Sequence, residues 1–165
     1  FWSKSLKVFA AVSNCFTGSI PLTLCNSTSI NTLALDGLQS ATSCRRALFP
    51  ASLDGIVAKG LYSIDNPLTG GVPRCLFQMA NLTTLHLSGN GLTGELPSDL
   101  TITPTLTDLS LSHNKLEGKV PSAVLNRDWT NLDLSYNRFT GELRVNHSRS
   151  YSPDSSIYLE QNRLS

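Results

Sequence analysis

The sequence predicts an α/β repeat solenoid, because one short phrase recurs along nearly all of its 165 residues. In the clearest copy, leucines spaced as Leu-x-x-Leu-x-Leu precede Asn90, and Gly94 and Pro97 follow it. A period of between about 20 and 50 residues is typical of stacked repeats. We therefore expect short strands from successive repeats to lie side by side around one shared core.

Seven repeats are predicted, each located by its anchor, the residue that corresponds to Asn90. The anchors are Asn14, Leu38, Asn66, Asn90, Asn114, Asn137 and Asn162. Successive anchors are 24, 28, 24, 24, 23 and 25 residues apart, which gives a repeat of about 24 residues with one insertion, assigned to the second repeat around residues 42–49. Because the repeats span the chain, we expect residues 1–165 to form a single solenoid domain.

The positions up to the anchor each have a physical reason. In Leu-x-Leu, the alternation of a strand places both leucines on one side. One strand alone would bury too little apolar surface to offset the entropy of ordering its backbone, so neighbouring repeats must cover it. The anchor Asn lies where the chain leaves the strand, and its amide can bond backbone groups that have left the ladder. Leu38 at this position therefore predicts a local defect in the second repeat.

The positions after the anchor predict a turn and a short helix. Glycine four residues after the anchor suits unusual backbone dihedrals, and proline seven residues after it directs the chain across the back of the repeat. An apolar residue follows three positions later, and we interpret it as part of a short helical turn on the convex side. These apolar residues are Leu24, Leu53, Leu76, Leu100 and Val124.

The composition argues against several classes of partner. Apolar residues make up 40% of the chain and charged residues 15%, the formal net charge is +1 and the pI is about 7.9. These values are typical of a globular protein and provide no basic face for nucleic acid or anionic lipid. No apolar run reaches the roughly 18 residues that would span a bilayer. We expect no nucleic-acid partner and no membrane span in this segment.

Cysteines and sequons indicate the secretory pathway. The cysteines lack the paired spacing of zinc and redox sites, which leaves disulfides or buried thiols for Cys15, Cys25, Cys44 and Cys75. N-linked glycans are expected at the three Asn-x-Ser/Thr sequons, which begin at Asn26, Asn81 and Asn146. Together these features predict an extracellular or cell-surface protein.

The segments Asn14–Pro21 and Asn90–Pro97 read Asn-x-Phe/Leu-Thr-Gly-x-Ile/Leu-Pro, which resembles the plant-type leucine-rich repeat. The resemblance covers essentially the whole chain. It implies a curved, right-handed solenoid with a parallel β-sheet on the concave face and a second short strand per repeat on one flank. It also implies the ectodomain of a receptor-like kinase or receptor-like protein, or a secreted inhibitor of cell-wall hydrolases, although similar repeats occur in algal and other protist surface proteins.

That family usually closes its solenoid with a cysteine-bearing cap at each end, and neither end of this sequence has one. Because an uncapped repeat would expose its core leucines, we expect a fragment of a longer chain. Cys15 and Cys44 would emerge on the same flank, which makes them the preferred disulfide among three possible pairings. Cys25 and Cys75 would lie two repeats apart, roughly 10 Å, which is too far for a bond. We expect them to be unpaired or bonded outside this segment.

The solvent-facing positions of the concave strands form the candidate ligand site. From the third repeat onward they carry a mixed aromatic and acidic strip, which suits a peptide, protein or glycan. The strip comprises Tyr62, Asp65, His86, Asp108, Asp133, Tyr136, Tyr158 and Glu160. In the first repeats the same positions carry an apolar patch of Ala10, Val12 and Ala34. Any single residue of the strip could serve solubility alone, so the hypothesis concerns the strip as a whole.

Catalysis is not expected. His86, Asp108 and Asp133 would lie on adjacent strands, but strand stacking explains their spacing, and no nucleophile motif or phosphate loop accompanies them. We therefore predict no enzyme activity, no metal and no cofactor. Two functions remain: recognition of a peptide, glycan or protein on the concave face, or a structural or adhesive scaffold in a wall, matrix or surface assembly of several copies or chains.

Overall fold

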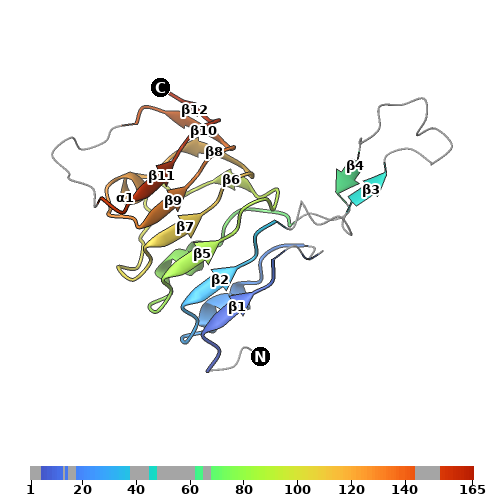
Figure 1. Cartoon of the computed structure of the whole chain (residues 1–165), viewed down its shortest axis with the longest axis vertical. Helices are drawn as coiled ribbons and strands as arrows, with labels where there is room; N and C mark the ends of the chain where they lie inside the picture. Colours follow the sequence, from blue (N-terminus) through green and yellow to red (C-terminus); the bar gives the residue numbers. More distant parts are fainter. Residues whose placement is uncertain are drawn as a thin grey trace.

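A computed structural model describes residues 5–12, 14, 18–37, 45–47, 62–64, 68–143 and 153–165, and at 45–47 and 62–64 it describes only the backbone strands. Six short strands, one from each coil, form a parallel sheet with the order β1-β2-β5-β7-β9-β11 (Figure 1). They are β1 (Val8–Ala10), β2 (Thr32–Ala34), β5 (Thr84–His86), β7 (Asp108–Ser110), β9 (Asn131–Asp133) and β11 (Ser156–Tyr158). The predicted stack of strands that run in one direction is confirmed.

A second parallel sheet follows on one flank, as the resemblance implied. It has the order β12-β10-β8-β6 and consists of β6 (Thr93–Glu95), β8 (Lys115–Lys119), β10 (Arg138–Gly141) and β12 (Arg163–Leu164). Five anchors are followed four residues later by a glycine with a positive φ, and three of these glycines lie within strands of this sheet rather than in the expected turn. The φ values are 83° at Gly18, 80° at Gly70, 85° at Gly94, 78° at Gly118 and 95° at Gly141.

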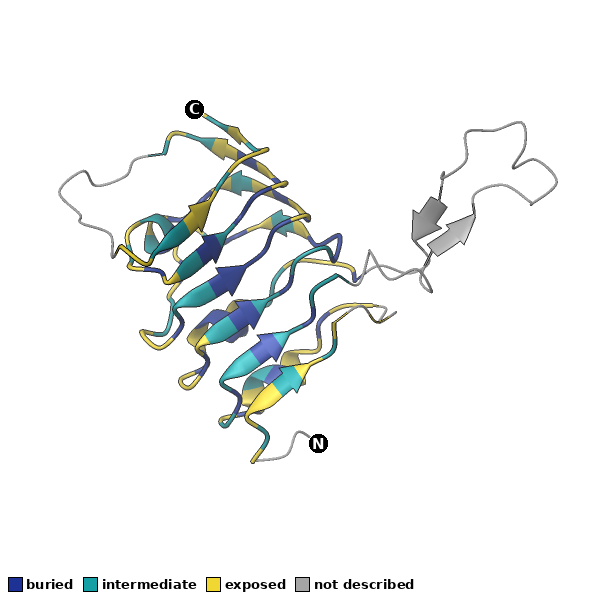
Figure 2. Ribbon diagram, viewed as in Figure 1, coloured by how far each residue is buried: buried dark blue, intermediate teal, exposed yellow. Residues whose placement is uncertain are grey.

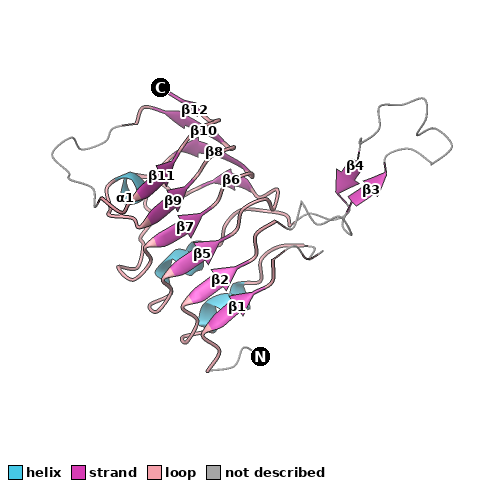
Figure 3. Cartoon of the chain, viewed as in Figure 1, coloured by secondary structure: helices cyan, strands magenta, loops and turns pink. Residues whose placement is uncertain are grey.

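Short helices lie behind the sheet on the convex side (Figure 3). They are the 3-10 helices η1 (Leu22–Asn26) and η5 (Arg74–Gln78) and the α-helix α1 (Ser122–Leu125), and each begins directly after a proline. Their predicted apolar residues Leu24, Leu76 and Val124 are buried. Leu100 is also buried, without a helix around it, and Leu53 lies outside the described residues.

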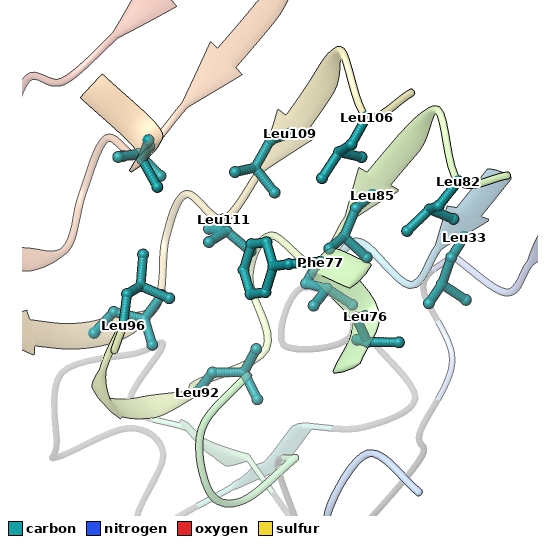
Figure 4. Packing of buried hydrophobic residues seen from close by; sticks show 14 of the residues in the cluster. Leu33, Leu76, Phe77, Leu82, Leu85, Leu92, Leu96, Leu106, Leu109 and Leu111 are labelled. Atoms are coloured by element: carbon teal, nitrogen blue, oxygen red, sulfur yellow. The ribbon is translucent and has the colours of Figure 1, made fainter. Parts of the chain in front are cut away.

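The core is continuous from coil to coil (Figure 2). Leu33, Leu85 and Leu109 have the same register in three adjacent strands, face the same interior and are fully buried (Figure 4). Phe77 from η5 closes this interior from the convex side and is fully buried too. Burial of a leucine stabilises by about 1.5–3 kcal/mol, so each coil depends on its neighbours for most of its stability.

The anchor asparagines tie adjacent coils together. The Nδ2 of Asn114 donates hydrogen bonds to the carbonyl oxygens of Leu87 and Leu111, both at 2.9 Å. Its Oδ1 accepts from the backbone N–H groups of Asn90 at 3.1 Å and Leu92 at 3.0 Å. Asn137 and Asn162 donate in the same way to backbone carbonyls of their own coil and the preceding one, and the Oδ1 of each accepts from one backbone N–H. The predicted role of the anchor amide is therefore correct.

The second and third predicted repeats form one coil. Strand β2 pairs directly with β5, whereas β4 (Tyr62–Ile64), the strand expected for the third repeat, pairs antiparallel with β3 (Arg45–Ala47) in a separate two-stranded sheet (Figure 1). The concave sheet of the described residues therefore has six strands where seven repeats were predicted. Tyr62 belongs to β4, so its expected position on the concave sheet was wrong.

The coil that begins with β2 resumes at Leu68. Leu68 bridges in parallel to Gly18 of the first coil, and the N–H of Thr93 donates to the carbonyl of Gly70 at 3.0 Å. Residues 68–78 thus complete the coil between those anchored at Asn14 and Asn90. The 28 residues that separate Leu38 from Asn66 are an insertion into one repeat. Because their number is close to the length of a repeat, the sequence predicted one repeat too many.

The insertion explains a disulfide that was predicted not to form. Cys25 and Cys75 are bonded, with their Cα atoms 5.7 Å apart. Since β2 and β5 are adjacent, η1 and η5 belong to neighbouring coils, whereas the sequence had placed them two repeats apart. The expectation that these cysteines were too distant was therefore wrong. Cys15 and Cys44, the preferred pair, lie outside the described residues.

Candidate functional site

The concave sheet aligns the predicted site residues in rows. The row four residues before the anchors runs Ala10, Ala34, His86, Ser110, Asp133 and Tyr158, each opposite the next. Asp108 lies in the row two residues earlier, and Tyr136 and Glu160 follow the strands. Six of the eight predicted residues therefore share one face, while Tyr62 lies in β4 and Asp65 lies outside the described residues.

A hydrogen-bonded cluster occupies the middle of this face. His86 lies between two carboxylates, with its Nε2 at 2.9 Å from Asp108 Oδ1 and its Nδ1 at 3.3 Å from Asp36 Oδ2. Asn131 donates to the same oxygen of Asp108 at 2.8 Å, and the backbone N–H of Ser88 donates to Asp36 Oδ1 at 2.6 Å. The cluster therefore joins β2, β5, β7 and β9. We call these four side chains, Asp36, His86, Asp108 and Asn131, the central cluster.

The central cluster keeps His86 charged. The pKa of His86 is raised to about 9, mainly by the hydrogen bond between His86 and Asp36. The hydrogen bond and charge of Asp108 also raise this pKa, whereas burial lowers it. The imidazolium is therefore the form present at neutral pH, and both of its N–H groups have acceptors. The predicted strip began at the third repeat and did not include Asp36, which belongs to the second.

Exposed aromatic and acidic side chains occupy the C-terminal end of the face. Tyr136 and Tyr158 are each 48% exposed, and the Tyr136 ring stacks on His113 with centroids 4.2 Å apart and planes 10° apart. Asp133 Oδ1 accepts from the N–H of Ser135 at 3.0 Å and from its hydroxyl at 2.6 Å. We call Asp133, Tyr136, Tyr158 and the exposed Glu160 the acidic-aromatic zone.

The N-terminal end of the face is apolar, as predicted. Val8 and Val12 are 54% and 50% exposed, Ala10 is exposed and Ala34 is partly exposed. We call these four residues the apolar zone. The three parts follow one another along the sheet, from β1 and β2 through the central cluster to β9 and β11.

Comparison with known proteins agrees with the geometry. The family model described as Leucine Rich Repeat matches residues 81–101 and 105–126. The ectodomain of the Arabidopsis thaliana receptor kinase GASSHO1/SCHENGEN3, solved with CASPARIAN STRIP INTEGRITY FACTOR 2, is 26% identical over 98% of this chain, with a TM-score of 0.66. The Arabidopsis HAESA ectodomain, solved with the IDA peptide hormone, is 25% identical over 98% of this chain, with a TM-score of 0.68.

The chain folds as a leucine-rich-repeat solenoid that is similar to the ectodomains of these plant receptor kinases. It spans 16% of the GASSHO1/SCHENGEN3 chain and 22% of the HAESA chain, so it corresponds to a small part of each ectodomain. A chain of the Arabidopsis BIR3–SERK2 complex is 28% identical over 76% of this solenoid, which covers 65% of that chain, with a TM-score of 0.53. None of the curated protein sequences compared with the solenoid matches it.

Two predicted glycan sites lie away from the concave strands of the solenoid. Asn26 is exposed at the end of η1, and Asn81 is exposed in the turn before β5, where its Nδ2 donates to the carbonyl of Thr28 at 2.6 Å. Asn146 lies outside the described residues. The solenoid therefore presents both sequons on its convex side and edge, and glycosylation itself stays a prediction.

The described residues add two findings about chemistry and membranes. Within the described ranges, no three His, Cys, Asp or Glu side chains are arranged to hold a metal ion. None of the helices described here combines the length and apolar character needed to cross a bilayer. The concave face of the solenoid is accordingly a set of positioned polar, aromatic and apolar side chains.

Proposed function

We propose that this solenoid is a recognition module that binds a peptide or protein outside the cell, on its concave face, without catalysing a reaction. The observation that carries the proposal is the acidic-aromatic zone, where two half-exposed tyrosines lie beside carboxylates on a rigid sheet. Tyrosine gives a large contact area with a polar tip at low entropic cost, and it is enriched among the residues that dominate binding energy.

Two further observations support the proposal. The solved ectodomains that this chain resembles at 25–26% identity are described in complex with a peptide hormone and with CASPARIAN STRIP INTEGRITY FACTOR 2. The disulfide between Cys25 and Cys75 also favours an oxidising compartment, consistent with an extracellular location and with the sequons.

A random peptide library of about twelve residues, panned on the immobilised chain, tests the proposal. The selected peptides are then measured against Tyr158→Ala and against Arg163→Ala, a matched variant with an exposed side chain on the flanking sheet of the same coil. We expect Tyr158→Ala to weaken binding about fivefold or more and Arg163→Ala to change it less than twofold.

Three outcomes decide the question. Loss of binding in Tyr158→Ala alone supports the concave face. Loss in Arg163→Ala alone moves the site to the flank and overturns the proposal. Failure to select any peptide removes the case for a peptide ligand. Circular dichroism of both variants checks that the solenoid remains folded.

A further inference from the structure

The concave face has a direction. The apolar zone lies on β1 and β2, the central cluster joins β2, β5, β7 and β9, and the acidic-aromatic zone lies on β9 and β11 and the turns after them. A face of this kind distinguishes one end of a ligand from the other.

We infer that the ligand is an extended peptide that crosses the strands with apolar side chains over the apolar zone and lysine or arginine side chains over the acidic-aromatic zone. The inference rests on the proposed function and names the chemistry of the partner. It does not follow from overall charge, since the formal net charge of the chain is +1.

The carboxylates of the acidic-aromatic zone are available for a cationic partner. Asp133 uses only Oδ1, for Ser135, and neither Asp133 nor Glu160 has a cationic partner among the described residues. Tyr158 lies opposite Asp133 in the register of β9 and β11. A lysine or arginine can therefore meet a carboxylate and a ring face together, which strengthens binding beyond a lone surface ion pair.

The central cluster does not compete for the charged part of the ligand. His86 bonds to both Asp36 and Asp108, so the one cation of the cluster is already paired with carboxylates. Beside it, the Ser88 hydroxyl bonds to the Ser110 hydroxyl at 2.6 Å and accepts from the Ser112 hydroxyl at 3.1 Å. The polar groups of this part of the face are already held in hydrogen bonds with one another. The contacts that distinguish one ligand from another therefore lie at the two ends of the face.

The fold also sets the length of the ligand. From β1 to β11 the sheet has five strand spacings of about 4.8 Å each, or about 24 Å in total. An extended chain advances about 3.3 Å per residue, so about seven residues are needed to reach both zones. A shorter peptide would contact one zone only and would lose the gain from joining two contacts in one molecule.

The test uses fluorescein-labelled block peptides of about nine residues, each with three apolar residues, a Gly/Ser spacer and two arginines. Two versions are made, one with the apolar residues at the N-terminus and one with the arginines there. A scrambled peptide of the same composition and a peptide with glutamate in place of arginine are the ligand controls. Anisotropy titrations at low and high salt give the affinities, because exposed ion pairs weaken as salt rises.

Two matched double variants isolate the charge contact. D133N with E160Q removes the carboxylates of the acidic-aromatic zone, and E95Q with E117Q makes the same charge change on the exposed flank strands β6 and β8. One exposed ion pair changes affinity by up to about fivefold. We therefore expect D133N with E160Q to weaken binding of the arginine-containing block peptide about tenfold, and E95Q with E117Q to weaken it less than twofold. Val8→Ser with Val12→Ser should weaken the same peptide about fivefold.

Several results overturn the inference. It is wrong if the glutamate peptide or the scrambled peptide binds as tightly as the best block peptide, or if the flank variant weakens binding as much as D133N with E160Q. If library peptides bind through Tyr158 but carry neither arginine nor lysine, the proposed function stands and this inference fails. If neither library nor block peptides bind, both fail.

Discussion

Deletion of residues 38–65 should give a folded and more stable solenoid. Joining Gly37 to Asn66 places residues 32–37 directly before residues 66–73, and this sequence of fourteen residues matches residues 84–97 at nine positions. The match includes both strand leucines, the anchor Asn, the turn Gly and the closing Pro. The deletion therefore restores a complete repeat from two halves that the structure already places in one coil.

The expected gain has two sources. Asn90 Oδ1 is buried without a hydrogen-bond partner, whereas Asn114 Oδ1 accepts two backbone N–H groups from the preceding coil. In the deletion, the N–H of Leu68 occupies the corresponding donor position, and satisfying a buried acceptor contributes about 1–3 kcal/mol. Replacing an excursion of 28 residues by a direct link saves about 2 kcal/mol of chain entropy.

These gains outweigh the loss of the β3–β4 pair, because an isolated two-stranded sheet is marginal in stability. We expect a net increase of about 3 kcal/mol in the free energy of unfolding, which corresponds to about 10 °C in Tm for a chain of this size. Urea denaturation and calorimetry give both values. Since the deletion removes Cys44, the deletion and its full-length control both carry Cys15→Ser.

The control for the deletion is the same variant with Asn66→Ala. If Asn66 becomes the anchor of the restored coil, its loss costs more than about 1 kcal/mol, as expected for a buried group that bonds several backbone atoms. A deletion variant that unfolds, or that leaves Cys25 and Cys75 as free thiols, would mean that residues 38–65 belong to the folded core. The reasoning about a single interrupted repeat would then be refuted.

Three further predictions concern the residues that hold adjacent coils together. Asn114→Leu should lower the free energy of unfolding by about 3 kcal/mol or more in urea, because five backbone groups lose a hydrogen bond to the Asn114 side chain. An effect below about 1 kcal/mol would contradict the role of the anchor. Cys25→Ser with Cys75→Ser should cost about 4 kcal/mol for a closed loop of this size, and equal stability under reducing and oxidising conditions would argue against the bond. The pKa of His86, about 9, lies above the ordinary value of 6.5, so its stabilising effect is complete below pH 6.5 and is lost as the pH rises through 9. Because water screens this half-buried ion pair, stability should fall by about 1–2 kcal/mol between these limits, and a pH profile identical to that of His86→Gln would exclude this origin.

The sequence predicts which residues line up in rows on the concave face, because the repeat determines their positions. Each anchor determines the register of its strand, so the positions of Asp133, Tyr158 and Glu160 could be read directly from the spacing. The central position of His86 between two carboxylates could not, because it depends on which coils are neighbours. Sequence periodicity indicates where a strand lies but not which strand pairs with it.

One wrong assumption about residues 38–66 produced two wrong predictions and one omission. Tyr62-Ser63-Ile64 alternates like the other strands and does form a strand, but its partner is β3. With a coil assumed between β2 and β5, Cys25 appeared too far from Cys75, and the contact between Asp36 and His86 was not predicted. The sequence does mark this segment as irregular, since Leu38 replaces the anchor Asn and the spacing of 28 residues exceeds the usual 24. An insertion close to one period in length nevertheless resembles a further repeat.

The residue directly before each anchor links the fold to the proposed function. Its backbone is left-handed in every coil where it is described, with φ of 70° at Gly37, 72° at Gly89, 53° at His113, 53° at Tyr136 and 57° at Gln161. Glycine adopts this conformation without strain, whereas other residues lose about 1 kcal/mol or more. The coils of β2 and β5 have glycine there, Gly37 and Gly89, whereas the next two coils have His113 and Tyr136, which accept the strain and stack on each other. Strain of this kind persists where a side chain contributes something other than stability, and it falls in the same coils as the carboxylates proposed to bind the ligand.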